Sequence, residues 1–453
     1  MTRLPLVGHA SLDDVIAYRN GGAITVRQFL RDVRQVAALL PAGERVLNVC
    51  QDRYHFAVGF AAALARGKSS LLPSTHTTEM VRRLRETAPD LFCLCDQPTT
   101  IDLPQVFYPA GAAPATQEEA EMPLIPAHHP AAYVFTSGSS GTPLPHRKDW
   151  GDLVACAHAE ARQLGLQPRR RFTLIGTVPP QHMYGFESTL LLALHNGIAF
   201  GAAHPFYPAD IAGALEAVPG PRILVTTPIH LRALLESGIT LPRLDLLLSA
   251  TAALPRDLAS LAEARMGAPL QEIYGSTETG QIASRRSAQS DRWTLFPGVR
   301  LQVGEGTAVA HGGHVSQPTP LHDVIESIDA EHFLLHGRMA DLVNIAGKRN
   351  SLDYLNHQLN AIPGVVDGAF FLPSEAGARD VTRLMAFVVA PTLDAAAIRA
   401  ALRERVDPVF LPRPLLHVES LPRNRTGKLP RAALQALAAR LMGSAAEAVD
   451  DAA

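Results

Sequence analysis

Segments typical of β-strands and α-helices alternate near the start of the chain, and this alternation constrains the fold more than any other feature. Strand-like apolar runs occur at Arg45–Cys50, Ser69–Leu72 and Leu91–Cys95. The segment Tyr54–Arg66, between the first two runs, has the composition of a helix. Strands that alternate with covering helices predict a parallel sheet. The chain is therefore expected to adopt an α/β fold.

The alternation resumes after a polar connector at Pro109–Pro130, so the sequence predicts two wound α/β blocks. A helix is expected at Tyr184–His195 in the second block. Strand-like runs of the second block are Ala131–Thr136, Phe172–Thr177, Arg222–Thr226, Leu244–Ser249 and Leu270–Tyr274. Short strands with glycine pairs between Trp293 and His336 indicate a small β subdomain.

A smaller segment with its own helix–strand rhythm follows Gly337-Arg338. We therefore expect a large N-terminal domain at residues 1–338, formed by the wound blocks and the small β subdomain. A small α+β C-terminal domain is expected at residues 339–453.

Composition excludes several classes of protein. The 453 residues are 47% hydrophobic, enough for a substantial core at about 150 residues per domain. Lysine and arginine number 41 against 43 aspartates and glutamates, so no overall positive field attracts nucleic acid or an anionic membrane. The best candidate for a membrane span, Leu190–Phe200, is interrupted by His195-Asn-Gly197, and neither a spanning helix nor a signal peptide is expected.

The chain contains four cysteines, Cys50, Cys93, Cys95 and Cys156. They are expected to be free thiols, which predicts a reducing, cytoplasmic location.

A run of hydroxyl residues and glycines, Thr136-Ser-Gly-Ser-Ser-Gly-Thr-Pro143, directly follows a strand-like segment. Glycines let backbone N–H groups converge on an anion, and hydroxyl groups add donors. Because α/β sheets bind ligands at the carboxyl ends of parallel strands, this run predicts a polyphosphate-binding loop, with an ordinary flexible loop as the alternative. The residues of this predicted phosphate loop are Thr136, Ser137, Gly138, Ser139, Ser140 and Gly141.

The run Gly67-Lys68-Ser69 matches the end of the common P-loop motif, Gly-x4-Gly-Lys-Ser/Thr. The first glycine of that motif is replaced by Ala62. We therefore interpret this second run as a chance match.

A second glycine- and hydroxyl-rich segment, Tyr274-Gly-Ser-Thr-Glu-Thr-Gly280, also follows a strand-like run. Its carboxylate, Glu278 beside Thr277, could hold Mg²⁺, which proteins bind through one or two carboxylates together with substrate phosphates. The alternative is a strand-ending turn with a solvated glutamate.

Two weaker motifs lie further along the chain. Arg338 follows Gly337 at the predicted domain junction, with Asp323 upstream. The segment Pro422–Arg431 contains Lys428 after a glycine. Alone, each has a simple alternative, because a lysine in a turn is usually just exposed.

Together and in this order, the motifs resemble those of the adenylate-forming superfamily, which includes acyl- and aryl-CoA synthetases, non-ribosomal adenylation domains and luciferases. Its members read Thr-Ser-Gly-Ser-Thr-Gly-x-Pro-Lys, Tyr-Gly-x-Thr-Glu, Thr-Gly-Asp, Gly-Arg at a hinge, and Gly-Lys near the carboxyl end. The resemblance covers nearly the whole chain. It implies a mobile C-terminal domain and the use of ATP with Mg²⁺.

The resemblance also implies roles for particular residues. The predicted phosphate loop would hold the ATP phosphates, and Tyr274 would contribute to nucleotide binding. Thr277 and Glu278 would meet the α-phosphate and Mg²⁺, with Glu278 as the metal ligand.

In the remaining motifs, Asp323, the only retained residue of Thr-Gly-Asp, and Arg338 would bind the ribose hydroxyls. Lys428 would be the catalytic lysine of adenylation. The segment Pro179–Gly185 is similar to the family's His-x-x-Gly element, which places His182 beside the acid; the alternative is a packed or exposed histidine.

The sequence departs from the family pattern at several positions. Leu144 replaces the phosphate-loop lysine, and either Lys148 or Arg147 could supply the missing charge, or pyrophosphate is bound more weakly. Ser249-Ala-Thr251 stands where Gly-Gly is usual, and Ala340 occupies the usual charged hinge position.

The resemblance implies an ATP-dependent acid–thiol ligase. Among its members, the chain looks most like stand-alone ligases of aryl-polyene and xanthomonadin-type pathways, which implies a hydroxybenzoate-like acid. The acceptor would be the phosphopantetheine thiol of an acyl carrier protein or CoA. Alternatives are a fatty or hydroxy acid, an amino acid whose ammonium group meets Glu187, and a non-catalytic nucleotide-binding scaffold.

The segment between Arg399 and Arg431 has an excess of basic residues. This excess could attract an acidic carrier protein or the phosphates of CoA, or it could be a solvated face.

Overall fold

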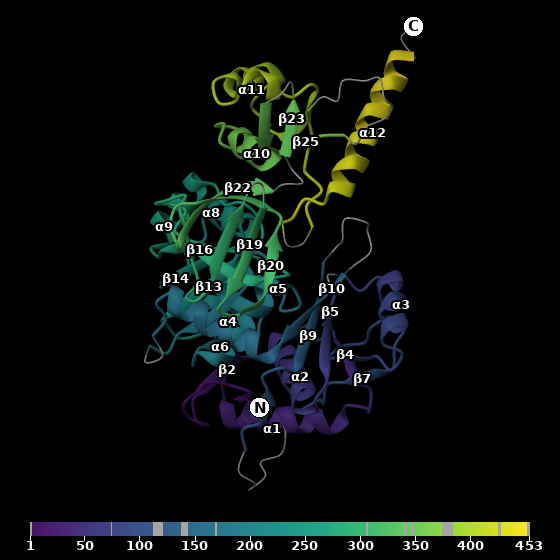
Figure 1. Ribbon diagram of the computed structural model, residues 1–453, viewed down its shortest axis with the longest axis vertical. Coiled ribbons are helices and arrows are strands. Elements are labelled where there is room, and N and C mark those ends of the chain that lie inside the picture. The colour runs from purple at the N-terminus through teal and green to yellow at the C-terminus, as the bar shows by residue number, and fades with distance from the viewer. Residues whose placement is uncertain are drawn as a thin grey trace. The chain divides into compact units, whose positions relative to one another are not determined.

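Figure 1 shows the computed structural model of the chain, and its strands and helices confirm the expected α/β class. The residues that the structure describes are 2–73, 75–111, 121–136, 144–167, 170–304, 307–338, 342–345, 348–373, 384–424 and 427–450. The chain forms two compact units. The first unit comprises residues 1–250, 258–301 and 310–319, and the second comprises residues 251–257, 302–309 and 320–453.

The first sheet of the first unit has the strand order β10-β9-β5-β4-β6-β7. Its strands are β4 (Arg45–Asn48), β5 (Ser69–Leu72), β6 (Phe92–Cys95), β7 (Gln105–Phe107), β9 (Pro130–Thr136) and β10 (Leu144–Asp149). All neighbouring strands are parallel except β10, which runs antiparallel to β9. The helices that precede or connect these strands in the sequence are α1 (Val26–Leu39), α2 (Arg53–Ala65) and α3 (Thr78–Thr87). The strands expected at Arg45–Cys50, Ser69–Leu72 and Leu91–Cys95 are confirmed. The run Ala131–Thr136, expected in the second block, instead forms β9 of this first sheet, where it pairs with β5.

Packing on the first sheet follows from the apolar face of α3. Met80, Val81 and Leu84 recur at helical spacing and pack with Leu47 of β4 and Leu71 of β5. Thr77 begins this helix by accepting a hydrogen bond from the Met80 N–H at 3.3 Å.

The second sheet of the first unit runs, within that unit, in the order β17-β16-β15-β14-β13-β11-β12-β2-β3. Its strands are β2 (Val15–Arg19), β3 (Gly22–Thr25), β11 (Thr173–Gly176), β12 (Ala199–Gly201), β13 (Arg222–Thr226), β14 (Leu246–Ser249), β15 (Leu270–Ser276), β16 (Gly280–Arg285) and β17 (Trp293–Leu295). Its helices include α4 (Trp150–Gln163), α7 (Pro208–Glu216), α8 (Pro228–Ser237) and α9 (Arg256–Met266). The run from β12 through β15 is parallel, whereas β16 returns antiparallel to β15.

The helix expected at Tyr184–His195 is present but irregular. It consists of α5 (Met183–Gly185), a π-helical stretch (Phe186–Leu191) and α6 (Leu192–His195). The π-helical stretch is fully buried, and such stretches often occur at functional sites.

The small β subdomain that we expected between Trp293 and His336 is only partly separate. Trp293 lies in β17, which pairs with β16 and belongs to the second sheet. A three-stranded sheet follows, formed by β18 (Arg300–Gly304), β19 (Thr307–Gly312) and β20 (Val315–Leu321). A further pair joins β1 (Arg3–Pro5) to β8 (Leu124–Pro126).

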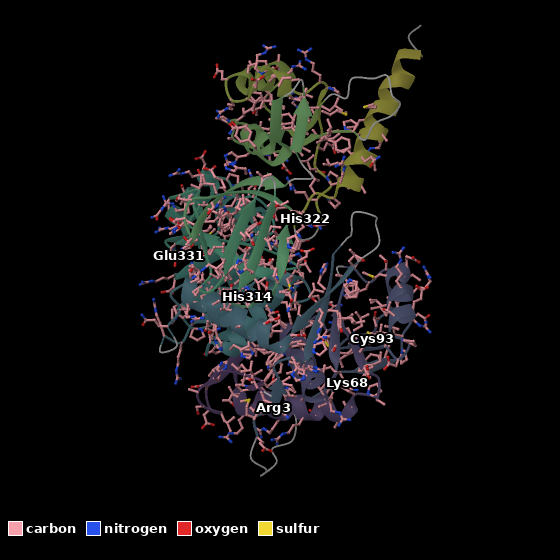
Figure 2. All side chains as sticks on the ribbon, viewed as in Figure 1. Arg3, Lys68, Cys93, His314, His322 and Glu331 are labelled. Atoms are coloured by element: carbon pink, nitrogen blue, oxygen red, sulfur yellow. The ribbon has the colours of Figure 1, made fainter. Side chains whose placement is uncertain are left out.

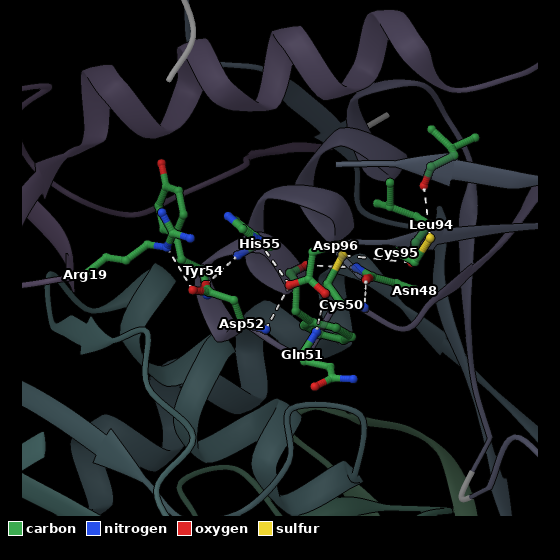
Figure 3. Close-up of polar contacts among 12 residues, drawn as sticks. Arg19, Asn48, Cys50, Gln51, Asp52, Tyr54, His55, Leu94, Cys95 and Asp96 are labelled. Carbon is green, nitrogen blue, oxygen red and sulfur yellow. Dashed lines mark hydrogen bonds and ion pairs between the residues drawn. The ribbon is translucent and has the colours of Figure 1, made fainter. Parts of the chain in front are cut away.

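Buried polar contacts fix the start of α2 (Figure 3). Asp52 accepts from the N–H groups of Tyr54 and His55, which caps the helix, and Arg19 donates to Asp52 at 2.8 Å. Asp96 accepts from the backbone of Asp52 and contacts His55 at 3.0 Å. Helix α2 is thereby anchored to both β2 and the end of β6.

Arg53 connects α2 to the second sheet. Its side chain is fully buried and donates to the carbonyl oxygens of Gly176, Val178 and Ala203, each at 2.9 Å. These carbonyls lie at or after the carboxyl ends of β11 and β12. One guanidinium group therefore satisfies backbone acceptors that would otherwise be buried without partners.

The second unit contains two antiparallel strand pairs and a separate three-stranded sheet. The pairs are β21 (Asp323–Ser327) with β22 (His332–Arg338), and β23 (Leu342–Ile345) with β24 (Lys348–Ser351). The sheet consists of β25 (Asp367–Phe371), β26 (Met385–Val389) and β27 (Leu415–His417), with the helices α10 (Leu352–Asn360), α11 (Ala395–Arg403) and α12 (Arg431–Asp450) and a 3-10 turn at Pro408–Phe410.

Helices cover both faces of this small sheet. Leu355 and Leu359 of α10 and Ile398 of α11 pack into one core cluster, whereas Leu434 and Leu437 of α12 pack into another. Alternating strand residues supply the two clusters, since successive side chains point to opposite faces. The unit is thus a sheet with helices on both sides.

All four cysteines are buried and free, as expected. Among the helices that the structure describes, none is both long and apolar enough to cross a membrane.

Candidate active site

The predicted phosphate loop closes a hairpin between two strands of the first sheet. Thr136 is the last residue of β9, Leu144 is the first of β10, and the two residues pair in register. Ser137, Gly138, Ser139, Ser140 and Gly141 lie outside the described residues. The ends of the loop therefore lie at the carboxyl end of the parallel strand β9.

Strand β10 directs different side chains to its two faces. Arg147 donates to Asp149 at 2.6 Å and to the His128 carbonyl at 3.0 Å, and remains exposed. Lys148 points the other way, is only 8% exposed, and donates to the carbonyl oxygen of Glu278 at 2.8 Å. Of the two cations that could compensate for Leu144, only Lys148 reaches the Tyr274–Gly280 motif through a described contact.

The tight turn between β15 and β16, Ser276–Gly280, is named here the Glu278 turn. Ser276 and Thr279 close it by reciprocal hydrogen bonds from the N–H of each to the hydroxyl of the other, both at 3.2 Å. Gly280 has a φ of +74°, and a Cβ there would lie 2.6 Å from a carboxylate oxygen of Glu187. Only glycine fits this position without strain, so the motif's last glycine is required by the turn.

Glu278 is a half-buried carboxylate at this turn, with a side chain 30% exposed. Burial favours the neutral acid, but hydrogen bonds from its own backbone N–H and from Ser276, together with His146 and Lys148, hold its pKa below the usual range. His146 Nε2 lies 3.6 Å from Glu278 Oε1. An accessible, ionised carboxylate is suited to holding Mg²⁺ beside substrate phosphates, so Glu278 fits the ion.

A cluster of buried ionisable groups, formed by Lys148, Glu187 and Cys156, adjoins the Glu278 turn. Burial lowers the pKa of Lys148, while the nearby acids Glu187 and Glu278 act in the opposite direction. Burial raises the pKa of Glu187 to about 7, and the Cys156 thiol lies 3.5 Å from its Oε1. The Glu187 carboxyl group is therefore buried and already contacts another protein side chain.

A second buried acid extends this cluster. Glu160 lies on α4, and burial raises the pKa of its carboxyl group to about 8. Ser188 donates to Glu160 at 2.6 Å and accepts from the Gln281 amide at 2.6 Å. Sequence reasoning did not connect Glu160 or Lys148 with Glu187, because these groups interact only through packing between distant segments.

Three other predicted site residues lie in the first unit. Tyr274 is half-buried in β15, with its ring centroid 5.5 Å from that of Trp293. His182 precedes α5, and its backbone N–H donates to the Pro179 carbonyl at 3.1 Å. Thr277 is half-buried in the Glu278 turn.

The remaining predicted site residues lie in the second unit. Asp323 and Arg338 are register partners in the β21–β22 pair, so the strand pairing brings together the two residues assigned to the ribose. Lys428 is exposed, and its backbone N–H donates to the Asn424 side chain at 2.9 Å. Arg423 supports this turn by donating to Gly427 O at 2.9 Å.

Residues 9–310 match the family described as "AMP-binding enzyme", which covers more than half of the chain. The chain belongs to this family. The adenylate-forming resemblance is confirmed, and this AMP-binding enzyme carries both glycine-rich motifs of the first unit inside the matched region.

Curated relatives of this AMP-binding enzyme include acid–CoA ligases. It is 31% identical over 297 residues to 4-coumarate–CoA ligase of Rhodobacter capsulatus, covering 65% of this chain and 73% of that protein. It is 32% identical over 325 residues to 4-coumarate–CoA ligase of Halorhodospira halophila, covering 68% and 78%. A 4-chlorobenzoate–CoA ligase of Arthrobacter is 25% identical over 351 residues, covering 68% and 66%.

Solved structures share the fold of this AMP-binding enzyme. ATP-bound MatB from Rhodopseudomonas palustris superposes with a TM-score of 0.80 at 19% identity, covering 94% of this chain and 96% of that one. The AMP complex of the O-succinylbenzoate coenzyme A synthetase MenE from Bacillus subtilis has a TM-score of 0.78 at 17% identity, covering 93% and 95%. Both superpositions cover nearly the whole of this chain, so the fold that it shares with these structures includes its smaller C-terminal part.

Proposed function

We propose that this enzyme activates a carboxylic acid with ATP and transfers the acyl group to a thiol. The observation that carries the proposal is the Glu278 turn: an ionised carboxylate held beside the strand that closes the predicted phosphate loop. Such an arrangement can bind a polyphosphate and its counter-ion at the carboxyl end of a parallel strand. Membership of the AMP-binding enzyme family supports this interpretation.

The reaction needs no nucleophile from the protein. An oxygen of the acid attacks the α-phosphorus of ATP, the bond to the pyrophosphate oxygen breaks, and an acyl-adenylate forms. A thiolate then attacks the acyl carbon and AMP leaves. The enzyme contributes position and charge, which in a site that excludes water can lower the barrier by several kcal/mol.

Residues of the first unit would bind the nucleotide and the acid. Thr136–Gly141 would hold the phosphates, Tyr274 would line the nucleotide site, and Thr277 would meet the α-phosphate. Glu278 would hold Mg²⁺, which offsets negative charge on the phosphate oxygens. His182 would lie beside the acid.

Residues of the second unit would complete the reaction. Asp323 and Arg338 would bind the ribose hydroxyls, and Lys428 would offset charge during adenylation. Residues 339–453 would act as a mobile C-terminal domain that withdraws Lys428 before the thiol attacks.

The acid is proposed to be an aryl acid such as a hydroxybenzoate. Relatives named for 4-coumarate and 4-chlorobenzoate support an aromatic acid. Glu187 is 3% exposed and already contacts the Cys156 thiol, which disfavours an amino acid whose ammonium group needs that carboxylate. The acceptor is proposed to be the phosphopantetheine thiol of CoA, as in the relatives' names, or of an acyl carrier protein.

Pyrophosphate exchange with a panel of aryl acids, fatty acids and amino acids tests the proposal. We expect exchange that depends on the acid, is greatest with aryl acids, and is lost on chelation of Mg²⁺. Product analysis with CoA and with a carrier protein identifies the acceptor. Binding of AMP without exchange for any acid would instead identify a nucleotide-binding scaffold.

A further inference from the structure

We propose that Lys148 is a positioning residue, whose buried ammonium group fixes the Glu278 turn to the strand that closes the predicted phosphate loop. The inference rests on the proposed function, because that function assigns nucleotide activation to Glu278. The sequence offers Lys148 only as one of two cations that could replace the charge lost at Leu144, and a positioning role emerges from the structure.

Lys148 joins the two sheets of the first unit at the candidate site. It lies in β10 of the first sheet, whereas the Glu278 turn connects β15 and β16 of the second sheet. The 2.8 Å hydrogen bond ends on the backbone carbonyl of Glu278, not on its carboxylate. The contact therefore holds the chain in place and leaves the carboxylate oxygens available for a ligand.

The surroundings of Lys148 suit this role. Its side chain is 8% exposed, and the carboxylates that favour its charged form are, in order of decreasing effect, Glu187, Glu278 and Asp152. A buried cation is costly unless charges and acceptors compensate it, so the ammonium group has few alternative positions. The ammonium group donates its hydrogen bond to the Glu278 carbonyl, while the charge of Glu187 favours the protonated form.

The position of Lys148 along β10 strengthens the argument. Side chains two apart in a strand share a face, so His146 lies on the same face and approaches the Glu278 carboxylate at 3.6 Å. Residue 148 lies only four positions beyond Leu144, where the hairpin resumes after the predicted phosphate loop. A shift of β10 would thus change the phosphate loop and the Glu278 turn together.

The chain offers a matched control for Lys148. Lys68, labelled in Figure 2, is 5% exposed and also donates to one backbone carbonyl, that of Gly43, at 2.5 Å. Gly43 lies in a connection between α1 and β4, away from every predicted site residue in sequence. Loss of either ammonium group removes the same kind of contact, but only Lys148 contacts a proposed nucleotide-binding turn.

The test compares Lys148→Met, Lys148→Arg and Lys68→Met in the full chain. Hydrogen exchange of the ligand-free proteins reports on the amides of residues 276–280. Calorimetry gives the Kd for ATP with Mg²⁺, and pyrophosphate exchange gives KM and kcat. For Lys148→Met we expect about tenfold faster exchange at the turn and about tenfold weaker ATP binding, as for loss of one charge-assisted hydrogen bond.

Partial rescue in Lys148→Arg and an unchanged turn in Lys68→Met are the expected control results. If Lys148→Met matches Lys68→Met in turn exchange and ATP binding, the positioning role is overturned. If the wild type shows no pyrophosphate exchange with any acid, the proposed function fails, while hydrogen exchange still decides the role of Lys148.

Lys148→Met leaves Glu187 without its cationic neighbour, which could prevent folding. The double variant Lys148→Met/Glu187→Gln removes both charges while nearly preserving volume, and the same measurements apply to it. Faster exchange at the turn in this variant supports the inference, and exchange equal to that of the wild type overturns it.

Discussion

The turn that carries Glu278 and the turn that carries Lys428 each contain a glycine and present one charged side chain, yet the protein holds them differently. The Glu278 turn is half-buried and is bound from behind by buried Lys148. The Lys428 side chain is exposed, and Arg423 supports its turn from the base. The Glu278 carboxylate, which is proposed to stay in place, lies on a turn held by a buried lysine. The Lys428 ammonium group, which is proposed to approach and withdraw, lies on an exposed turn.

Lys428→Ala should give the largest effect and tests the exposed member of this comparison. Adenylation is expected to fall about 10²- to 10³-fold, because the cation that offsets phosphoryl charge is lost. The melting temperature should stay near that of the wild type, since the side chain is exposed. Pyrophosphate exchange and thermal unfolding measure the two quantities.

Thioester formation from supplied acyl-adenylate provides the internal control for Lys428→Ala. It should remain largely intact in the variant. Equal losses in both half-reactions would contradict a role confined to adenylation.

Arg423→Lys should have a smaller effect and tests whether the base of the Lys428 turn needs to be rigid. Arg423 donates to both carboxylate oxygens of Asp367, at 2.8 and 2.7 Å, and to Gly427 O. Lysine cannot reproduce this fork, so we expect adenylation to fall about threefold to tenfold and stability by about 1 kcal/mol.

Arg27→Lys is the matched control for Arg423→Lys, because Arg27 forms an exposed pair with Asp13 in the first unit. Steady-state kinetics and urea unfolding of both variants make the comparison. Adenylation equal in Arg423→Lys and wild type would show that the base of the turn need not be fixed.

Glu160→Gln should leave activity nearly unchanged and tests the buried cluster through pH. The pKa of Glu160 is raised to about 8 in the folded protein, above its ordinary value of 4.5. Folding therefore favours the protonated acid: the stabilisation is complete below about pH 4.5 and is lost as the pH rises through 8. Residue 160 stays neutral in the variant. Between pH 6 and pH 9, the free energy of unfolding of the variant should therefore fall by on the order of 2 kcal/mol less than that of the wild type.

Urea unfolding at both pH values checks this expectation, with the exposed Glu331→Gln as control. The control should follow the wild type at each pH. Identical pH dependence in Glu160→Gln and wild type would show that burial of Glu160 is not linked to its protonation.

The sequence predicted the parallel strands well and the buried cluster poorly, for one physical reason. Strands such as β4 and β13 are buried and therefore read as apolar runs. Strand β10, Leu-Pro-His-Arg-Lys-Asp, lies at a sheet edge, where one neighbour suffices and polar side chains are tolerated. Its polar composition concealed the strand, and with it the face that carries Lys148.

The order of the four motifs allowed the family to be predicted, but not the contacts around them. Glu187 was a candidate for a substrate ammonium group until the structure showed it buried against Cys156 and Gly280. Those contacts join segments about 30 and 90 positions away, so no local spacing reveals them. The phosphate-loop residues 137–141 lie outside the described part of the chain, and their roles stay predictions.

Arg53 has a consequence for how the larger unit can evolve. Its guanidinium group belongs to the first wound block but satisfies carbonyls of the second. A recombination event that replaced one block with that of a distant homologue would leave either the buried guanidinium group or its carbonyl acceptors without hydrogen-bond partners. The two blocks are therefore expected to be inherited together.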